Sequence, residues 1–343
     1  MIATESTALD KLKTEDECHS PNESTALVGV EEPAMALHVL VGKGPVGSTT
    51  ATELVARGHE VRILSRSGGV STSDVEHRQV DATDADALTA ATRGAAALYN
   101  AVNPAYHRWA TDWPPVAAAL LTAAERTGAV LVTMSNLYAY GRPSGPMTPD
   151  SPLAATDTKG RVRARMWLDA LAAHEAGRAR VTEARAADFV GPQVPGSQSH
   201  LGRQLGSIRK GRRAWVIGDP DAPRTWAYLP DVAATLATLG TDERSLGRAW
   251  HVPSNPPRSQ RQALGDLAAA MGRPAVPVSA IPWPVLRAMG VAVPLLREVV
   301  DVRHQFDSAY VIDSRATTQT FGLTATPWDE VVRATVAGMP VTA

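Results

Sequence analysis

The hydrophobic positions of the chain fall into alternating short and long runs from residue 35 onward. The first, Leu37 to Val41, is an apolar run of strand length that ends in glycines, and a helical pattern over 45–58 follows it. The alternation continues with strands expected at 59–67, 96–102, 129–135 and 181–192, and with helices expected at 82–94, 114–128 and 161–177. Strands that alternate with helices predict an α/β fold with a doubly wound parallel sheet of the Rossmann type.

The two ends of the chain have a different character. Residues 1–34 are rich in Ser, Thr, Glu and Asp without sustained periodicity, so we expect a disordered leader, with a short docking arm as the alternative. Residues 35–190 carry the predicted sheet. Beyond them, Pro and Gly interrupt shorter segments, which predicts a smaller mixed α/β lobe over 191–343 that returns some segments to the sheet.

The composition narrows the class of protein. Hydrophobic residues make up 44% of the 343 positions and charged residues 20%, which is typical of a soluble globular protein. The net charge of −1 points to neither nucleic acid nor an anionic membrane, and no apolar run reaches the roughly 18 residues of a membrane span. The one cysteine, Cys18, fits a reducing compartment, and the N-terminus lacks a secretory pattern, so we expect a cytoplasmic protein. The histidines show no zinc-site spacing, and no metal is expected.

Three glycines follow the first predicted strand at the spacing G-x-G-x-x-G: Gly42, Gly44 and Gly47. Gly42 permits the tight turn, Gly44 lets a pyrophosphate approach the backbone, and Gly47 lets the helix pack against the strand. The helix presents its N-terminus to the phosphates, and Lys43 and Val46 lie inside the same turn. We therefore predict that this turn binds a pyridine dinucleotide.

The end of the second predicted strand bears on which dinucleotide is bound. An NAD-selective site usually has a carboxylate there, whereas this chain has Ser65 and Arg66. Arg66 can grip a 2′-phosphate and stack on adenine, so we favour NADP over NAD; a solvated loop cation is the alternative. Asp81 is placed to meet the adenine amino group or to cap a helix, and Asn100, at the end of a later strand, is expected beside the cofactor.

Four ordered segments resemble the extended short-chain dehydrogenase/reductases, the group that holds NAD-dependent epimerases and dehydratases of nucleotide sugars. They are HVLVGKGPVGSTTATELVARGHEVRILSRS (38–67), MSNLYAYG (134–141), RAADFVGP (185–192) and GDPDAPRTWAYLPDVA (218–233). The resemblance spans nearly everything from residue 35 on. It implies a nicotinamide cofactor and a small-molecule substrate, and it makes a homodimer through the predicted helices around 114–128 and 161–177 plausible.

The chain departs from this family at the catalytic positions. In the family a Ser or Thr hydroxyl orients the substrate carbonyl, a Tyr transfers the proton, and a Lys four residues later activates the Tyr and holds the nicotinamide ribose. Here those positions fall on Asn136, with Ser135 just before it, on Lys159 and on Arg163, and Asp188 replaces the Asn of the third segment. The resemblance therefore implies an atypical branch with a rewritten catalytic set.

Two interpretations of the rewritten segment remain open. On a helix, Lys159 and Arg163 share one face; near this second cation and partly desolvated, Lys159 would exchange its proton near neutral pH, while Arg163 stays charged and can contact ribose. Tyr138 and Tyr140 offer a second route to a proton donor. In the alternative interpretation the cations coat a solvated helix and Tyr140 only packs.

Aromatic and basic residues are candidates for a substrate pocket. Tyr106, Trp109 and Trp113 follow the strand that should face the nicotinamide, and they can line a pocket or simply pack. The resemblance places Arg224 on a substrate pyrophosphate, with Trp226 beside it to stack on a ring or to fill the C-terminal lobe. That lobe is expected to bind the substrate.

Three functions fit these observations. The first is an NADP-dependent oxidoreductase or epimerase that acts on a carbonyl or alcohol of a small molecule, with hydride chemistry from the cofactor. The second is a non-redox lyase or cyclase that retains the dinucleotide as a structural element. The third is a binding or regulatory protein whose cofactor occupancy reports redox state. The glycine turn favours the first, and the missing Tyr weakens it.

Overall fold

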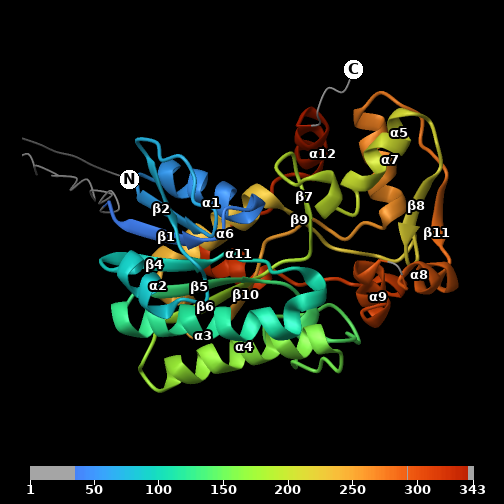
Figure 1. Ribbon diagram of the computed structural model, residues 1–343. Helices are drawn as coiled ribbons and strands as arrows, with labels where there is room; N and C mark the ends of the chain where they lie inside the picture. The colour runs from blue at the N-terminus through green and yellow to red at the C-terminus, as the bar shows by residue number, and fades with distance from the viewer. Residues whose placement is uncertain (1–34, 292, 339–343) are drawn as a thin grey trace, which may run out of the picture. The chain divides into compact units, whose positions relative to one another are not determined.

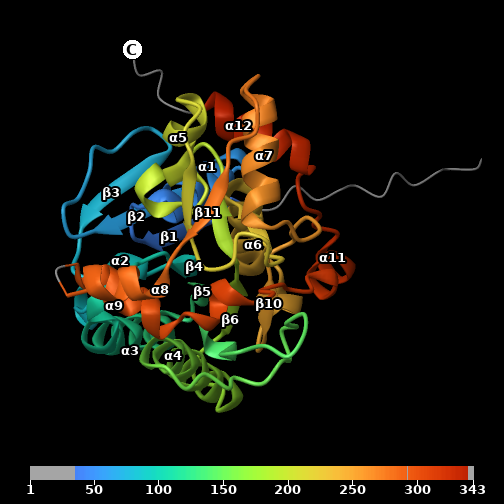
Figure 2. The ribbon, with the colours of Figure 1, turned by 90° about the vertical axis from the view of Figure 1, so that its right-hand side faces the viewer.

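The computed structural model describes residues 35–291 and 293–338, apart from the side chains of residues 197, 294 and 295. Its central sheet has seven strands in the order β10-β6-β5-β4-β1-β2-β3, and every pairing is parallel. Figure 2 shows the strands following one another from β3 to β10. They are β1 (Leu37–Val41), β2 (Glu60–Ser65), β3 (Val75–Gln79), β4 (Ala95–Asn100), β5 (Val130–Ser135), β6 (Val181–Arg185) and β10 (Ala249–His251). The predicted doubly wound sheet is confirmed, and its strand order reverses between β1 and β4, where open α/β sheets bind ligands.

Helices cover both faces of this sheet (Figure 1). One face carries α1 (Pro45–Ala56) and α6 (Leu229–Thr241), and the other carries α2 (Ala85–Thr92), α3 (Trp109–Thr127) and α4 (Thr158–Glu175). Consecutive side chains of a strand point to opposite faces, so each strand supplies both layers. The sheet is therefore buried on both sides, as a parallel sheet must be.

The first strand illustrates how the core is divided. Leu40 packs into the hydrophobic cluster beneath α1 and α6, whereas Val39 and Val41 pack into the cluster beneath α2, α3 and α4. All three side chains are buried. Because β1 packs into both clusters, Gly42, which follows it, has a fixed position at the carboxyl end of the sheet.

Two helices begin earlier than the hydrophobic pattern predicts. Helix α3 starts at Trp109 instead of residue 114, because Trp109 and Trp113 lie one turn apart on its inner face and are both buried. Helix α4 starts at Thr158 instead of residue 161, because the Asp157 carboxylate accepts a hydrogen bond from Gly160 N at 2.8 Å and caps the helix. Lys159 and Arg163, two of the altered positions, therefore lie in the first turns of a capped helix.

Two features of the sheet were also missed. The strand expected at 181–192 is two strands, β6 and β7 (Asp188–Val190), and β7 pairs with β9 (Trp226–Tyr228) outside the main sheet. Strand β3 has the sequence VEHRQ, which lacks an apolar alternation because β3 is an edge strand with partly exposed residues.

The C-terminal part of the chain combines a small lobe with segments that join the main sheet. Strands β8 (Ala214–Ile217) and β11 (Val278–Ile281) pair in parallel and share a hydrophobic cluster with α7 (Gln260–Ala270). Strand β10 and helix α6 lie on the main sheet. The remaining helices are α5 (Leu205–Arg209), α8 (Trp283–Met289), α9 (Pro294–Asp301), α10 (His304–Asp307), α11 (Arg315–Phe321) and α12 (Trp328–Ala337). Within the described ranges, no helix has the length and apolar character needed to cross a membrane. The expected leader at 1–34 lies outside the described residues.

Candidate active site

The glycine segment forms the turn between β1 and α1. Gly42 has φ +112°, and a Cβ added to it would lie 2.5 Å from the carbonyl oxygen of Ala101. A Cβ added to Gly47 would lie 1.9 Å from the carbonyl oxygen of Gly42. The backbone conformation and the packing of the protein itself therefore require glycine at both positions.

Gly44 differs from the other two glycines of the motif. Its φ of −72° and ψ of −177° are open to any residue, and no heavy atom lies within 4 Å of the Cβ it would carry. It is the N-cap of α1, so the free N–H groups of the first turn face the same space. The protein gives no reason for glycine here, but a pyrophosphate against the helix N-terminus does, so these residues fit a dinucleotide.

Lys43 and Ser65 hold the loop that follows β2. The Lys43 ammonium donates to the carbonyl oxygen of Gly68 at 2.9 Å, and the Ser65 hydroxyl donates to the same oxygen at 3.1 Å. Arg66 lies exposed on this loop, and among the described residues it forms no ion pair. The guanidinium is therefore available to an incoming anion.

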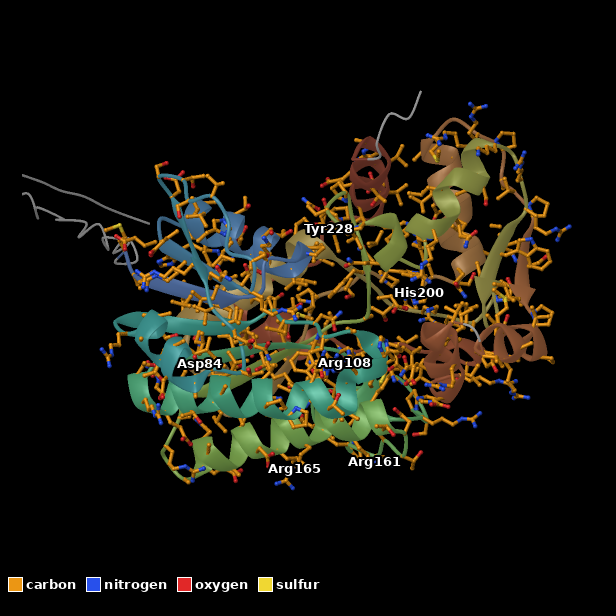
Figure 3. The ribbon with its side chains drawn as sticks, in the orientation of Figure 1. Asp84, Arg108, Arg161, Arg165, His200 and Tyr228 are labelled. Carbon is orange, nitrogen blue, oxygen red and sulfur yellow. The ribbon has the colours of Figure 1, made fainter. Side chains whose placement is uncertain are left out.

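Asp81 lies close enough to Arg66 for the two charges to interact. Its carboxylate accepts hydrogen bonds from the backbone N–H and the hydroxyl of Thr83, and these bonds, with a smaller contribution from Arg66, lower the pKa of Asp81. The N-cap of α2 is Asp84 and not Asp81. The helix-capping alternative for Asp81 therefore does not apply (Asp84 is labelled in Figure 3).

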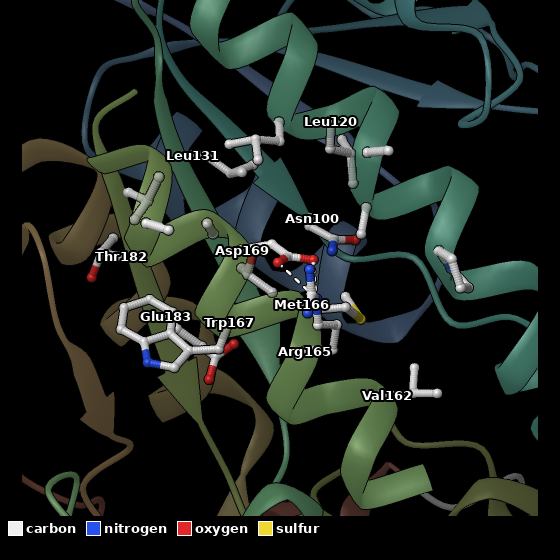
Figure 4. Close-up of a pocket in the computed structure, with 18 of the residues that line it drawn as sticks. Asn100, Leu120, Leu131, Val162, Arg165, Met166, Trp167, Asp169, Thr182 and Glu183 are labelled. Carbon is white, nitrogen blue, oxygen red and sulfur yellow. Dashed lines mark hydrogen bonds and ion pairs between the residues drawn. The ribbon is translucent and has the colours of Figure 1, made fainter. Parts of the chain in front are cut away.

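Asn100 ends β4 on the face covered by α3 and α4. Its Oδ1 accepts from Val102 N at 3.2 Å, and the residue lies at a cavity of about 640 Å³ between the two helices and the sheet. Figure 4 shows Asn100 and Glu183 around this cavity. Alanines of both helices, including Ala117 of α3 and Ala170 of α4, contribute to its wall beside larger apolar residues.

The segment after β5 brings a phenol pair to the carboxyl end of the sheet. Asn136 Oδ1 accepts from Tyr138 N at 3.2 Å, which shapes the 3₁₀ turn Tyr138–Tyr140. The Tyr106 hydroxyl donates to the Tyr138 hydroxyl at 3.3 Å. Burial raises the pKa of Tyr138 to about 12, so this phenol stays protonated at neutral pH and acts as a hydrogen-bond donor.

Lys159 is buried and not on the surface. Its ammonium forms an ion pair with Glu298 of α9 and lies 4.4 Å from the centre of the Tyr106 ring. The alternative of a solvated helix face applies to other residues of α4, because Arg161 and Arg165 are exposed and lie on the outer side of the helix (Figure 3). The charge that accompanies Lys159 is a carboxylate, which the sequence did not indicate.

Arg163 is inserted between two tryptophans. Its guanidinium carbon lies 4.6 Å from the ring centre of Trp109 and 4.2 Å from that of Trp113, and Nε and Nη1 have no hydrogen-bond partner among the described residues. Burial lowers the pKa of Arg163 to about 10, with Glu183 opposing the shift, so the cation persists at neutral pH. Trp113 has no exposed surface, and the two rings hold Arg163 in place.

A buried polar network lies behind these residues. Arg185 donates to Glu183 at 2.6 Å and to the Tyr140 hydroxyl at 2.7 Å, and that hydroxyl lies 2.7 Å from His251 Nε2. Ser135 also bonds to Glu183. His251 Nδ1 lies 2.9 Å from the carbonyl oxygen of Asp313 and must carry the proton to donate there, so the neutral ring accepts from the Tyr140 hydroxyl at Nε2. Tyr140 thus belongs to a supporting network in the interior.

Arg224 is also enclosed by protein. It is 2% exposed, forms an ion pair with Asp188, and donates to the carbonyl oxygen of Gln305 at 2.6 Å. His200 Nε2 lies 3.8 Å from the other oxygen of Asp188. Trp226 is buried and donates its indole N–H to Arg258 O. We predicted that Arg224 contacts a substrate pyrophosphate. In the structure its guanidinium already has a carboxylate partner.

Comparison with known proteins decides the family. The model of the NAD-dependent epimerase/dehydratase family matches residues 39–252, which is well over half of the chain. The chain belongs to this family. No curated protein sequence matches the chain significantly.

Solved structures of epimerases and dehydratases have the same fold as this chain. The dTDP-glucose 4,6-dehydratase of Bacillus anthracis, in complex with NAD, superposes with TM-score 0.72 at 15% identity, over 89% of this chain and 96% of that one. The Streptomyces venezuelae dTDP-glucose 4,6-dehydratase gives 0.70 at 19%, over 88% and 96%. The UDP-glucose 4-epimerase of Thermotoga maritima, with UDP-glucose, gives 0.72 at 15%, over 88% and 98%. The predicted membership of the NAD-dependent epimerase/dehydratase family is confirmed by the family model, and the solved structures confirm the predicted fold.

Several residues of this family member's site were invisible to sequence reasoning. Glu298 lies 139 residues from Lys159 in a short helix that carries no motif, and His200 lies in an irregular segment. Glu183 and Arg185 stand two apart in β6, a spacing that places both on one face of the sheet and that did offer a signal. Among the described residues, no group of three or more His, Cys, Asp or Glu side chains gathers to hold a metal ion.

Proposed function

We propose that this protein is a pyridine-nucleotide-dependent enzyme of the oxidoreductase or epimerase type that acts on a carbonyl or alcohol of a small molecule. The observation that carries the proposal is Gly44, a glycine that neither backbone nor packing requires, at the N-terminus of α1. Family membership supports it. The dehydratase structures from B. anthracis and S. venezuelae, which have the same fold, contain NAD. When bound, the cofactor supplies the hydride chemistry.

The binding claim is tested with two glycine variants. Gly44→Ala places a methyl group in the proposed pyrophosphate space, whereas Gly265→Ala adds one where no heavy atom lies within 4 Å of the new Cβ, in α7 of the C-terminal lobe. By titration calorimetry Gly44→Ala is expected to lower dinucleotide affinity at least about tenfold without loss of stability, and Gly265→Ala to leave it unchanged. Equal affinity in both variants would place the dinucleotide elsewhere.

NADP is the proposed cofactor. The support is the exposed guanidinium of Arg66 at the end of β2 and the absence of a carboxylate from that strand end, where Ser65 and Lys43 fix the loop instead. A 2′-phosphate adds two negative charges that Arg66 can pair, whereas NAD offers only hydroxyls. The structures compared above contain NAD, so a preference for NADP would be a property of this chain.

Proton transfer is assigned to the cluster at the start of α4. Lys159 exchanges the proton through its ammonium group, and Glu298 balances the charge. Asn136 stands where the resemblance places the carbonyl-orienting hydroxyl, and Ser135, just before it, bonds to the buried Glu183. Tyr138, held protonated, donates a hydrogen bond to the substrate oxygen. Arg163 keeps a positive charge beneath them.

A second function is favoured by a specific observation: both residues at the family's Tyr and Lys positions already have protein partners. Lys159 is paired with Glu298, and Arg163 is held between aromatic rings. A protein that binds the dinucleotide without turnover fits that arrangement. The two functions are separated by incubating the NADP-loaded protein with panels of alcohols, ketones and sugars while transient NADPH absorbance is followed. Turnover with any of them excludes the second function.

Two properties of the whole protein are also proposals. A single cysteine supports function in the reducing cytoplasm. A homodimer through α3 and α4 is supported by the open space between these helices (Figure 4). The half-exposed Leu168 on α4 supports it as well. Sedimentation equilibrium of the wild type and of Leu168→Glu tests the dimer, because a buried glutamate would dissociate it.

A further inference from the structure

The ion pair between Asp188 and Arg224 determines which charged group a ligand would contact on the C-terminal side of the site. Asp188 begins β7 and Trp226 begins β9, and the two residues are paired in the parallel ladder, so neighbouring strands fix the pair. The Arg224 side chain is 2% exposed and that of Asp188 is 26% exposed. A ligand that approaches this pair therefore meets the carboxylate before the guanidinium.

A second nitrogen of the Arg224 guanidinium is also occupied, whereas Nε has no hydrogen-bond partner among the described residues. Nη1 donates to the carbonyl oxygen of Gln305, and the Phe306 ring centre lies 5.0 Å from the guanidinium carbon. Burial raises the pKa of Asp188, but Arg224 and His200 outweigh this and lower it, so the carboxylate is ionised at neutral pH. The buried cation is thus compensated inside the protein.

The other two buried cations of the cluster are also held by protein groups. Lys159 forms an ion pair with Glu298, and Arg163 packs against two tryptophan rings with Glu183 nearby. A buried diphosphate needs several cations whose charge is not already neutralised. Of these three cations, only Arg163 lacks an ion pair with a carboxylate of the described residues, and one cation is not enough.

Neutral hydrogen-bonding groups lie beside the same pair. The Tyr310 hydroxyl and the Gln305 Nε2 are buried and have no partner among the described residues. Tyr310 and Tyr138 both interact electrostatically with Asp188 and Arg224, so these side chains surround one region. Uncharged donors among aromatic rings suit hydroxyl or carbonyl oxygens on an apolar body.

We propose that Asp188 is a specificity-determining residue: by neutralising Arg224 it excludes diphosphate-bearing substrates and selects an uncharged alcohol or ketone with an apolar body. This inference rests on the proposed function, because it names the substrate class of the same site. Arg203, at the exposed edge, acts on the same carboxylate. Removing the carboxylate charge would leave the Arg224 guanidinium to face an anion.

The test is the affinity for UDP of Asp188→Asn, which keeps the size and the hydrogen-bonding oxygen of the side chain. UDP is titrated calorimetrically into protein saturated with NADP, so that the dinucleotide site is closed to it. The wild type is expected to bind UDP more weakly than about 1 mM, and Asp188→Asn at least about tenfold more tightly than the wild type. The control is Asp221→Asn, which removes the acid of the exposed pair with Arg261 and should leave UDP binding unchanged.

Each other outcome has a defined meaning. Wild-type protein that binds UDP as tightly as Asp188→Asn overturns the inference, and so does a variant that gains nothing over Asp221→Asn. If Asp188→Asn does not fold, Asp188→Ser removes the same charge and is titrated in its place. If neither NADP nor NAD binds, the proposed function fails, and the UDP titration on the cofactor-free protein still decides the role of Asp188.

Discussion

The two ends of the proposed cofactor site are built by different means. At the β1–α1 turn the backbone makes the site, and Gly42 and Gly47 are fixed by contacts within the Rossmann core. At the start of α4 side chains make it, and Lys159 depends on Glu298, which is 139 residues away. The difference teaches that the glycine turn of this family member depends on contacts within a short segment, whereas Lys159 depends on a partner far along the chain.

Breaking the long-range pair is expected to have the largest effect. Lys159→Met leaves the partly buried carboxylate of Glu298 with only a longer ion pair, at 3.8 Å, to the exposed Arg297, so the free energy of unfolding should fall by about 3 kcal/mol. Urea denaturation measures it, with Arg165→Ala as control, because the exposed pair of Arg165 with Asp169 contributes less than about 1 kcal/mol. Turnover, once a substrate is known, should fall at least about tenfold. Similar stability losses in the two variants would contradict the account.

Acid should lower the stability of the protein, because it protonates two buried histidines, one in the strand that leads to the glycine turn and one in the buried polar network. Burial lowers the pKa of His38, in β1, and of His251, behind Tyr140, to about 4, whereas both have the ordinary value of 6.5 when unfolded. Between pH 6.5 and pH 4 the unfolded chain binds more protons, so stability is complete above pH 6.5 and declines as the pH falls. Each histidine contributes about 3 kcal/mol to this loss. Unfolding free energies from pH 7.5 to 4 measure it.

Substitution separates the histidine contribution from that of the carboxylates. His251→Gln should flatten the decline between pH 6.5 and pH 4, and His107→Gln, at an exposed position, should not. An unchanged slope in His251→Gln would show that the imidazole is protonated in the folded protein.

Within the turn, the third glycine should matter to folding and the second only to binding. Gly47→Ala forces a methyl group against Gly42 O, so the protein should lose about 1–3 kcal/mol of stability. Gly44→Ala should lose none. Thermal unfolding of the two variants measures this, and a Gly47→Ala protein as stable as the wild type would mean that the turn has room that the structure does not show.

The smallest effect expected is on cofactor choice. Arg66→Ala removes an exposed cation and should weaken NADP binding about tenfold, or about 1.4 kcal/mol, while NAD binding changes little. Fluorescence titration with NADPH and NADH measures both affinities. Equal losses for the two nucleotides would rule out a contact with the 2′-phosphate.

The same contrast explains what sequence reasoning achieved. The sheet and the glycine turn follow from patterns within a few residues, such as the apolar run that ends at Val41, and both were predicted. The early start of α3 was missed because its first turns hold prolines and polar residues, and only the tertiary burial of Trp109 and Trp113 reveals it. From the sequence we expected Lys159 to lie beside a cation. No sequence pattern indicates that Glu298 forms an ion pair with it.

A structure of the protein crystallised with saturating NADP tests the central claim most directly. The account predicts the pyrophosphate over Gly44 at the N-terminus of α1, the 2′-phosphate at Arg66, and the nicotinamide ring beside Tyr138 and Lys159. Density for the nucleotide at any other place, or none at the β1–α1 turn, would contradict it.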